Sequence, residues 1–264
     1  MIVGKNALYS EGYRIQTTLD ADIQRYAEHA FVEHMRKMHA EIRPDIDGAL
    51  VTLDVATGAV RALVGGYDFT ASKFNRAMQA QRQMGSILKP LIYAAAIEGG
   101  LRFDDTFIDE PLSLMSGGQL WQPRNNTLTF DGQMTLAHAL SRSNNIVSIK
   151  ALLAVGPEKA AEIIEKGQLG IVPAYPSLAL GCIDRTLLDV ASTFNIFANH
   201  GSYTKPHYLV WIKDAWGKKI YKTTVEYKQV VKPHVADQVN SVLQSSMERG
   251  KKRRAEWIDS EAID

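Results

Sequence analysis

The chain has 264 residues, of which 45% are hydrophobic, and its 30 basic residues against 29 acidic ones leave a net charge of +1. This balance argues against a nucleic-acid-binding surface or an acidic tail, and the single cysteine, Cys182, excludes an internal disulfide. The longest apolar runs, such as residues 91–97, are far shorter than the roughly 20 residues that a membrane span needs.

The first part of the chain predicts a strand, a helix and a pair of strands. Residues 14–18 read as a short strand, and Asp20 is a suitable N-cap for a helix that continues to about residue 42, because apolar residues recur at helical spacing there. Pro44 and Gly48 then interrupt the pattern. Residues 49–66 predict two strands joined by a turn at Thr57 and Gly58.

The rest of the chain predicts mostly helices. They are expected at residues 86–98, 134–154, 157–166 and 186–199, followed by a β-hairpin at 207–224 with Gly217 at its turn and a last helix at 233–248. Two strands, a block of helices and then further strands predict an α+β fold.

One short pattern, Gly-Ser-x-x-Lys-Pro, occurs twice, at residues 85–90 and 201–206. A serine three residues before a lysine can form a nucleophile with its own base. Ser202 lies between a helix end and the start of a strand, and on an extended segment residues three apart point to opposite faces. The second copy is therefore expected to be structural, with Gly201 as a helix C-cap.

Ser86 differs because a good helix follows it. At a helix start residues three apart share a face, so Lys89 is expected beside the Ser86 hydroxyl. Pro90 is tolerated in the first turn, where N–H groups have no helical partner. Those free N–H groups also favour an oxyanion that forms at Ser86.

Residues 65–101 closely resemble the segment around the active-site serine of class A penicillin-binding proteins, the bifunctional peptidoglycan synthases. The matching motifs, in chain order, are Asn75-Arg76-Ala77, Arg82-Gln83, Gly85 to Pro90, Tyr93, Trp121 to Asn125 and Ser143-Asn144-Asn145. Residues 13–30 also resemble the linker that leads into the transpeptidase domain of this family. The resemblance thus extends over nearly the whole chain and implies a transpeptidase fold like that of these proteins and of serine β-lactamases, a helical block against an antiparallel sheet.

The resemblance implies a D,D-transpeptidase that cross-links the stem peptides of peptidoglycan. Ser86 would be the nucleophile and Lys89 its base, Ser143 would relay a proton, and Asn145 would hold the peptide bond of the substrate. Two further residues, Trp121 and Asn125, and the backbone at Gly85 are expected to bind substrate.

The partners that the resemblance implies are a D-Ala-D-Ala donor, an acceptor amine on a neighbouring stem, and β-lactams as covalent inhibitors. It also implies a membrane-anchored parent protein that works on the extracytoplasmic face of the bacterial membrane, although this chain has no membrane span. No cofactor is expected. The chain has neither a His-Glu-x-x-His motif nor paired cysteines, so no metal site is expected either.

The sequence departs from the family in one motif. It contains no Lys-Thr-Gly or Lys-Ser-Gly, and Lys222 in "YKTT" is interpreted as the end of a hairpin because Thr224 stands where glycine is needed. The chain is therefore expected to be an internal piece of a larger protein. Residues 1–48 would lead in from a missing glycosyltransferase domain, and 49–264 would form a partial transpeptidase domain without its C-terminal strands.

Two alternatives remain. A non-catalytic module of the cell wall could keep the Ser86 helix and only bind partners. A hydrolase of the same superfamily, either a D,D-carboxypeptidase or a β-lactamase, would use the same serine, but the linker and the Asn-Arg-Ala segment argue against it.

Overall fold

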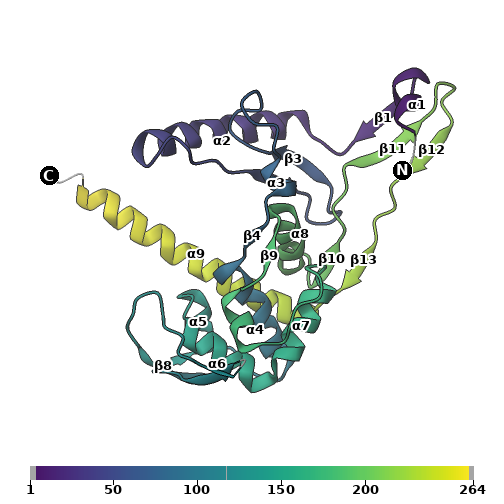
Figure 1. Ribbon diagram of the computed structural model, residues 1–264. Coiled ribbons are helices and arrows are strands. Elements are labelled where there is room, and N and C mark those ends of the chain that lie inside the picture. Colours follow the sequence, from purple (N-terminus) through teal and green to yellow (C-terminus); the bar gives the residue numbers. More distant parts are fainter. Residues whose placement is uncertain (1–3, 117, 262–264) are drawn as a thin grey trace. The chain divides into compact units, whose positions relative to one another are not determined.

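The computed structural model describes residues 4–116 and 118–261 (Figure 1). The chain divides into two compact units. The first comprises Met1–Gln81, Thr186–Asn195 and Tyr203–Lys228, and the second comprises Arg82–Arg185, Ile196–Ser202 and Gln229–Asp264. Each unit therefore combines segments that lie far apart in the sequence.

The first unit begins with a short helix that the sequence pattern did not predict, followed by the predicted strand, helix and strand pair. After α1 (Lys5–Ser10), strand β1 (Arg14–Thr17) leads to the long helix α2 (Ala21–Glu41). The side chain of Asp20 accepts hydrogen bonds from the backbone N–H groups of Asp22 and Ile23, so it caps the helix as expected. Strands β2 (Leu50–Leu53) and β3 (Val60–Val64) pair antiparallel, which confirms the predicted strand pair.

The core of this unit forms where α2 packs on β3. Apolar side chains on one face of the helix, including Phe31 and Met35, are buried against Ala62 and Val64 of the strand. Their spacing of four residues along α2 places them on the same helical face. The helix is otherwise mostly exposed, as its polar sequence requires.

The later strands of the first unit form a second antiparallel sheet. Strand β11 (Leu209–Lys213) pairs with β1 on one side and with β12 (Lys219–Lys222) on the other. Gly217 adopts a φ of 86° in the turn between β11 and β12, a conformation that glycine adopts without steric cost. The predicted hairpin is thus confirmed.

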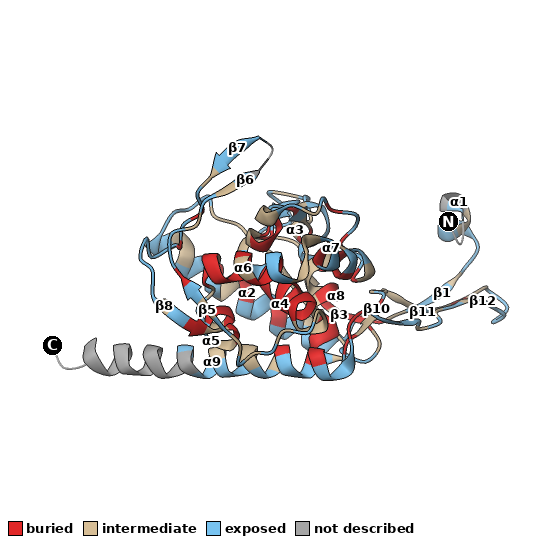
Figure 2. Cartoon of the chain, turned by 90° about the horizontal axis from the view of Figure 1, so that it is seen from below, coloured by how far each residue is buried: buried red, intermediate tan, exposed pale blue. Residues whose placement is uncertain are grey.

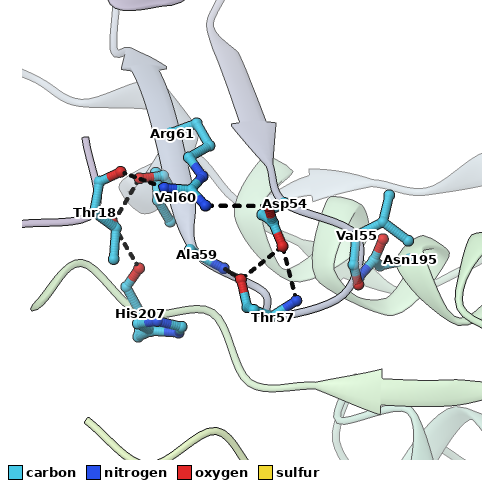
Figure 3. A network of polar contacts seen from close by, with 9 residues as sticks. All are labelled: Thr18, Asp54, Val55, Thr57, Ala59, Val60, Arg61, Asn195 and His207. Atoms are coloured by element: carbon cyan, nitrogen blue, oxygen red, sulfur yellow. Dashed lines mark hydrogen bonds and ion pairs between the residues drawn. The ribbon is translucent and has the colours of Figure 1, made fainter. Parts of the chain in front are cut away.

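Polar contacts join these segments around the start of β3 (Figure 3). The buried hydroxyl of Thr18 donates to the carbonyl of Val60 at 2.7 Å and lies 3.2 Å from the carbonyl of His207. Asp54 receives a hydrogen bond from Arg61 at 3.1 Å across the β2–β3 turn. Because the Thr18 hydroxyl contacts carbonyl groups of two segments that are distant in sequence, it connects the segment before α2 to the β2–β3 strand pair.

The second unit is built around the helix α4 (Lys89–Glu98), which contacts α6 (Asn145–Val155), α7 (Pro157–Lys166) and α9 (Pro233–Glu261). Eight consecutive residues of α4, from Lys89 to Ala96, are buried, as Figure 2 shows by the red of α4 and of much of α6. A helix that is apolar on all sides belongs in the interior. The single charged residue in this run is Lys89.

The remaining elements are the helix α8, of 12 residues, and short helices and strands. They are α3 (Arg76–Gln79), β4 (Arg82–Gln83), η1 (Gly85–Leu88), β5 (Thr106–Asp109), β6 (Leu114–Ser116), β7 (Gln119–Trp121), β8 (Gly132–Thr135), α5 (Leu136–Ser141), η2 (Pro176–Leu180), β9 (Asp184–Arg185), α8 (Leu187–Ala198), β10 (Ser202–Thr204) and β13 (Tyr227–Gln229). Helices and antiparallel strand pairs together confirm the α+β class.

Two predicted elements differ from the structure. The helix expected at 134–154 is instead strand β8 followed by two helices, α5 and α6, with a break at residues 142–144. The last helix, α9, extends to Glu261 rather than ending near 248, because residues 251–261 contain mostly good helix formers such as Lys, Arg, Ala and Glu. Among the described residues, no helix combines the length and the apolar character that crossing a bilayer would demand.

Candidate active site

The first candidate residue, Ser86, lies in the 3₁₀ turn η1, directly before α4. In a 3₁₀ turn residues three apart eclipse one another, so Lys89 lies on the same side as Ser86. The backbone N–H of Lys89 also donates to the carbonyl of Ser86. The serine is exposed, whereas the lysine is only 1% exposed. The predicted helix at 86–98 is therefore a 3₁₀ turn that continues as an α-helix, with an accessible hydroxyl at its start.

Backbone contacts hold the turn that carries Ser86. Strand β4 pairs with β9, and the N–H of Gly85 then donates to the carbonyl of Gly181 at 3.0 Å. Both glycines have positive φ, 55° and 70° respectively. A Cβ atom on Gly181 would lie 1.9 Å from the carbonyl oxygen of Gly85. Only glycine at 181 permits this approach.

The second candidate segment, Ser143 to Asn145, occupies the break between α5 and α6. Ser143 has a φ of 56°, which costs a non-glycine residue roughly 1 kcal/mol or more. Asn144 ends the break by capping α6, where its Oδ1 accepts from the N–H of Val147 at 2.8 Å. Periodicity alone did not reveal this break, because apolar residues continue at helical spacing across it.

The structure brings Lys89 onto this segment. Its Nζ donates to the carbonyl oxygen of Ser143 at 2.5 Å, to Ser143 Oγ at 3.0 Å and to Asn145 Oδ1 at 2.7 Å. Within the described part of the chain, Nζ has no ion pair with a carboxylate, and none of its hydrogen bonds leads to Ser86. The ammonium group is thus satisfied by neutral oxygens only.

Burial lowers the pKa of Lys89 from 10.5 to about 8. Removal from water disfavours the charged form of an amine, and here no nearby anion offsets that cost. A substantial fraction of Lys89 is therefore neutral near physiological pH, which is the form that can accept a proton.

The structure also places the expected substrate-binding residues. The side chain of Asn125 is buried, its Nδ2 donates to the carbonyl of Thr129 at 2.9 Å, and its Oδ1 accepts from the backbone N–H of Asn145 at 2.9 Å. Asn125 therefore lies beside the second candidate segment. Trp121 is half-buried at the end of β7, and Gly85 lies in the turn before Ser86.

The second copy of the pattern is separate from these groups in sequence and in environment. Ser202 begins β10, and its hydroxyl donates to Gln229 Oε1 at 2.9 Å. Lys205 is exposed, and so is Lys222 at the end of β12. No group of three His, Cys, Asp or Glu residues in 4–116 or 118–261 is placed to share a metal ion.

One residue of this region was not predicted from the sequence. Asp109, at the end of β5, is 2% exposed and receives hydrogen bonds from the side chains of Asn125 and Asn144. Its place between the predicted helices 86–98 and 134–154, next to Glu110 and Pro111, gave no sign of burial. Only the fold shows that this carboxylate lies behind the Ser143–Asn145 segment.

Comparison with known proteins identifies the family of the chain. The family model described as "Penicillin binding protein transpeptidase domain" matches residues 48–261. Penicillin-binding protein 1A of Neisseria meningitidis serogroup A is 42% identical over 180 residues, which cover 66% of this chain and 23% of that protein. Penicillin-binding protein 1A of Aquifex aeolicus is 35% identical over 235 residues, 88% of this chain and 32% of that protein.

Solved structures give the same result. The crystal structure of penicillin-binding protein 1A from Haemophilus influenzae superposes with a TM-score of 0.71 at 31% identity and covers 76% of this chain and 35% of that one. PonA1 from Mycobacterium tuberculosis in complex with penicillin V has a TM-score of 0.76 at 25% identity, over 91% of this chain and 65% of that one. The chain thus spans about a quarter to a third of the curated relatives' length, and its predicted fold family is confirmed.

Proposed function

Because the chain belongs to the family of penicillin-binding protein transpeptidase domains, we propose that it is a serine D,D-transpeptidase module of peptidoglycan synthesis. The observation that supports this most strongly is the buried Lys89. It follows the exposed Ser86 by one 3₁₀ turn and is held by three oxygens of Ser143 and Asn145. The same arrangement supports roles for all four residues in one acyl transfer.

Acylation begins with a proton transfer. Neutral Lys89 accepts the proton of the Ser86 hydroxyl, and Oγ attacks the carbonyl carbon of the penultimate D-Ala. The backbone N–H of Ser86 would donate to the developing oxyanion and stabilise it, since the neighbouring N–H groups of Gly85 and Ile87 donate to backbone carbonyls. The C–N bond then breaks, the terminal D-Ala leaves with a proton relayed by Ser143, and the acyl group remains on Ser86.

Transfer reverses the same steps. An amine of a neighbouring stem peptide attacks the ester, its proton passes back through Ser143 and Lys89, and Ser86 leaves with a proton restored. A β-lactam takes the place of the donor: its ring opens on attack, and because the amine stays attached, the acyl group persists on the serine.

We assign substrate binding to Asn145, Trp121, Asn125 and the backbone at Gly85. Asn145 Nδ2 donates to the carbonyl of Arg124 at 2.8 Å, which orients the amide that would hold the peptide bond of the substrate. The amide of Asn125 makes its hydrogen bonds within the protein. Asn125 therefore contributes to substrate binding indirectly, because it positions Asn145. In this proposal residues 49–264 belong to the transpeptidase domain, 1–48 lead into it, and the domain works on the extracytoplasmic face of the membrane.

Labelling with a fluorescent penicillin tests the proposal. After denaturation and electrophoresis, the native chain should carry a covalent band that is absent from Ser86→Ala, because the exposed Ser86 precedes the buried Lys89 by one turn and is the proposed nucleophile. Ser202→Ala is the matched control and should label like the native chain.

The outcome also decides between functions. A folded chain without any band would favour the non-catalytic wall module, which the lack of a Lys-Thr/Ser-Gly motif would explain. If the chain labels, a D-alanyl thioester donor with and without D-alanine as acceptor separates transfer from hydrolysis. Release of free acid alone would indicate a hydrolase.

The acylation rate should follow the titration of Lys89. With a pKa of about 8, the neutral fraction rises about tenfold from pH 6 to pH 7 and levels off above about pH 9. The stability of the fold also increases with pH. Because the pKa of Lys89 in the folded chain lies below the unfolded value of 10.5, the free-energy penalty for burying Lys89 decreases as pH rises from about 8 to 10.5. Acylation rates measured with a chromogenic β-lactam from pH 6 to 9.5 check this, and a flat profile would exclude Lys89 as the base.

A further inference from the structure

A buried carboxylate lies behind the catalytic segment of the second unit. Asp109 ends β5, which pairs with β8 in the register Asp109 to Gly132. Its side chain receives four hydrogen bonds, two from Asn125 Nδ2 at 2.9 and 3.0 Å, one from Asn144 Nδ2 at 2.8 Å and one from the backbone N–H of Asp131 at 2.9 Å. Among the described residues no cation pairs with it, so amide donors alone compensate its charge.

The carboxylate determines which way two amide side chains face. An ionised carboxylate only accepts hydrogen bonds, so Asn125 and Asn144 must turn their NH₂ groups toward Asp109. Their oxygens then face the opposite way. Asn144 Oδ1 caps α6 at the N–H of Val147, and Asn125 Oδ1 accepts from the N–H of Asn145.

These two oxygens hold the first turn of α6, directly after the break at residues 142–144. The break carries Ser143 at a φ of 56°, a conformation that persists only where its surroundings impose it. Ser143 and Asn145 supply all three oxygens that bind Lys89 Nζ. A path of direct hydrogen bonds therefore runs from Asp109 through Asn125 to the backbone of Asn145, whose side-chain oxygen binds the lysine, and a second path through Asn144 fixes the start of α6.

We propose that Asp109 is a positioning residue for the acyl transfer: its buried negative charge orients Asn125 and Asn144 so that the Ser143–Asn145 segment holds Lys89 toward Ser86. The proposal rests on the function proposed above, but its claim about the position of the Lys89 side chain can be tested without catalytic activity. It also explains why a carboxylate without a cation is buried here, since an amide at position 109 would turn an NH₂ group toward the Asn125 amide in place of the oxygen that now accepts from it.

The test compares three variants of the full chain. Asp109→Asn keeps the shape but removes the charge and replaces one of the two acceptor oxygens by an NH₂ group, whereas the double variant Asp109→Asn with Asn144→Asp returns a carboxylate to the cluster from the other side. Asp104→Asn is the matched control, because Asp104 is exposed and pairs only with Arg102 near the same strand. The readouts are the penicillin acylation rate, the NMR resonance of the ¹³Cε-labelled Lys89 side chain, and the melting temperature.

We expect Asp109→Asn to slow acylation by about 100-fold, the size of loss that a misplacement of about 1 Å can cause, and to shift the Lys89 resonance. The double variant should recover to within about tenfold of the native rate and return the resonance, while Asp104→Asn should change neither. If Asp109→Asn slowed acylation only by destabilising the fold, exchanging the acid and the amide between positions 109 and 144 would not restore the rate.

The possible failures are distinguishable. If the native chain is not acylated at all, the proposed transpeptidase function fails, but the Lys89 resonance still tests Asp109. The positioning role is overturned if Asp109→Asn leaves rate and resonance unchanged. It is also overturned if the double variant fails to fold, or folds without restoring the resonance of Lys89.

Discussion

Replacing Lys89 by Arg is expected to slow penicillin acylation of Ser86 by roughly 10³-fold, within the range that a general base contributes. A guanidinium group does not deprotonate in proteins, so the variant keeps the positive charge and the hydrogen-bond donors but cannot accept the serine proton. The first-order rate of adduct formation at saturating penicillin measures this loss.

Lys150→Arg is the matched control for this change. Lys150 lies on α6 of the same unit and pairs with Glu110 at 2.8 Å, so the control makes the same replacement away from the serine. It should acylate at the native rate. A Lys89→Arg variant that folds and acylates as fast as the native chain would leave Lys89 with a structural role only.

Replacing Gly181 by Ala should slow acylation by about 100-fold, because the turn that carries Ser86 must move. The added Cβ would lie 1.9 Å from the carbonyl oxygen of Gly85, which is backbone and cannot rotate away. The substitution also imposes a φ of 70° on a residue with a side chain. Stopped-flow acylation and thermal melting of the same sample measure the two consequences.

Gly100→Ala separates the clash from the backbone strain. Gly100 also has a positive φ, 104°, but nothing lies within 4 Å of the position of its added Cβ. This variant should lose stability without a comparable loss in the acylation rate. If Gly181→Ala acylates as fast as Gly100→Ala, the contact between Gly181 and Gly85 does not place the nucleophile.

The sequence predicted the elements whose local signals agree with their packing. In α2 the N-cap at Asp20 and the apolar residues that include Phe31 and Met35 point to the same helix, and Gly217 marked its hairpin because its turn requires a positive φ. Local pattern and tertiary structure coincide in these elements.

The break before α6 could not be predicted in this way. The segment around Ser143 has helical periodicity, but long-range contacts from Asp109 and Asn125 hold a left-handed residue there. Strained residues fixed by distant neighbours are common at functional sites. Asp109 could not be predicted for the same reason, because its burial depends on contacts between residues up to 35 positions apart in the sequence.

The pair of Ser-x-x-Lys patterns shows where local reasoning was sufficient for the candidate site. Secondary structure alone separated Ser86, at a helix start, from Ser202, at the beginning of β10. The contact of Lys89 with Ser143 and Asn145 spans 54 and 56 positions. Spacing cannot reveal such a contact, and the order of motifs in a family could only imply it.

Peptide mapping of the penicillin adduct tests the central claim most directly. The native chain is incubated with penicillin, digested and analysed by mass spectrometry, and the modified residue is located by fragmentation. We expect one adduct, with the full mass of the opened penicillin, on Ser86. An adduct on Ser143 or Ser202, or a folded chain that carries none, would contradict it.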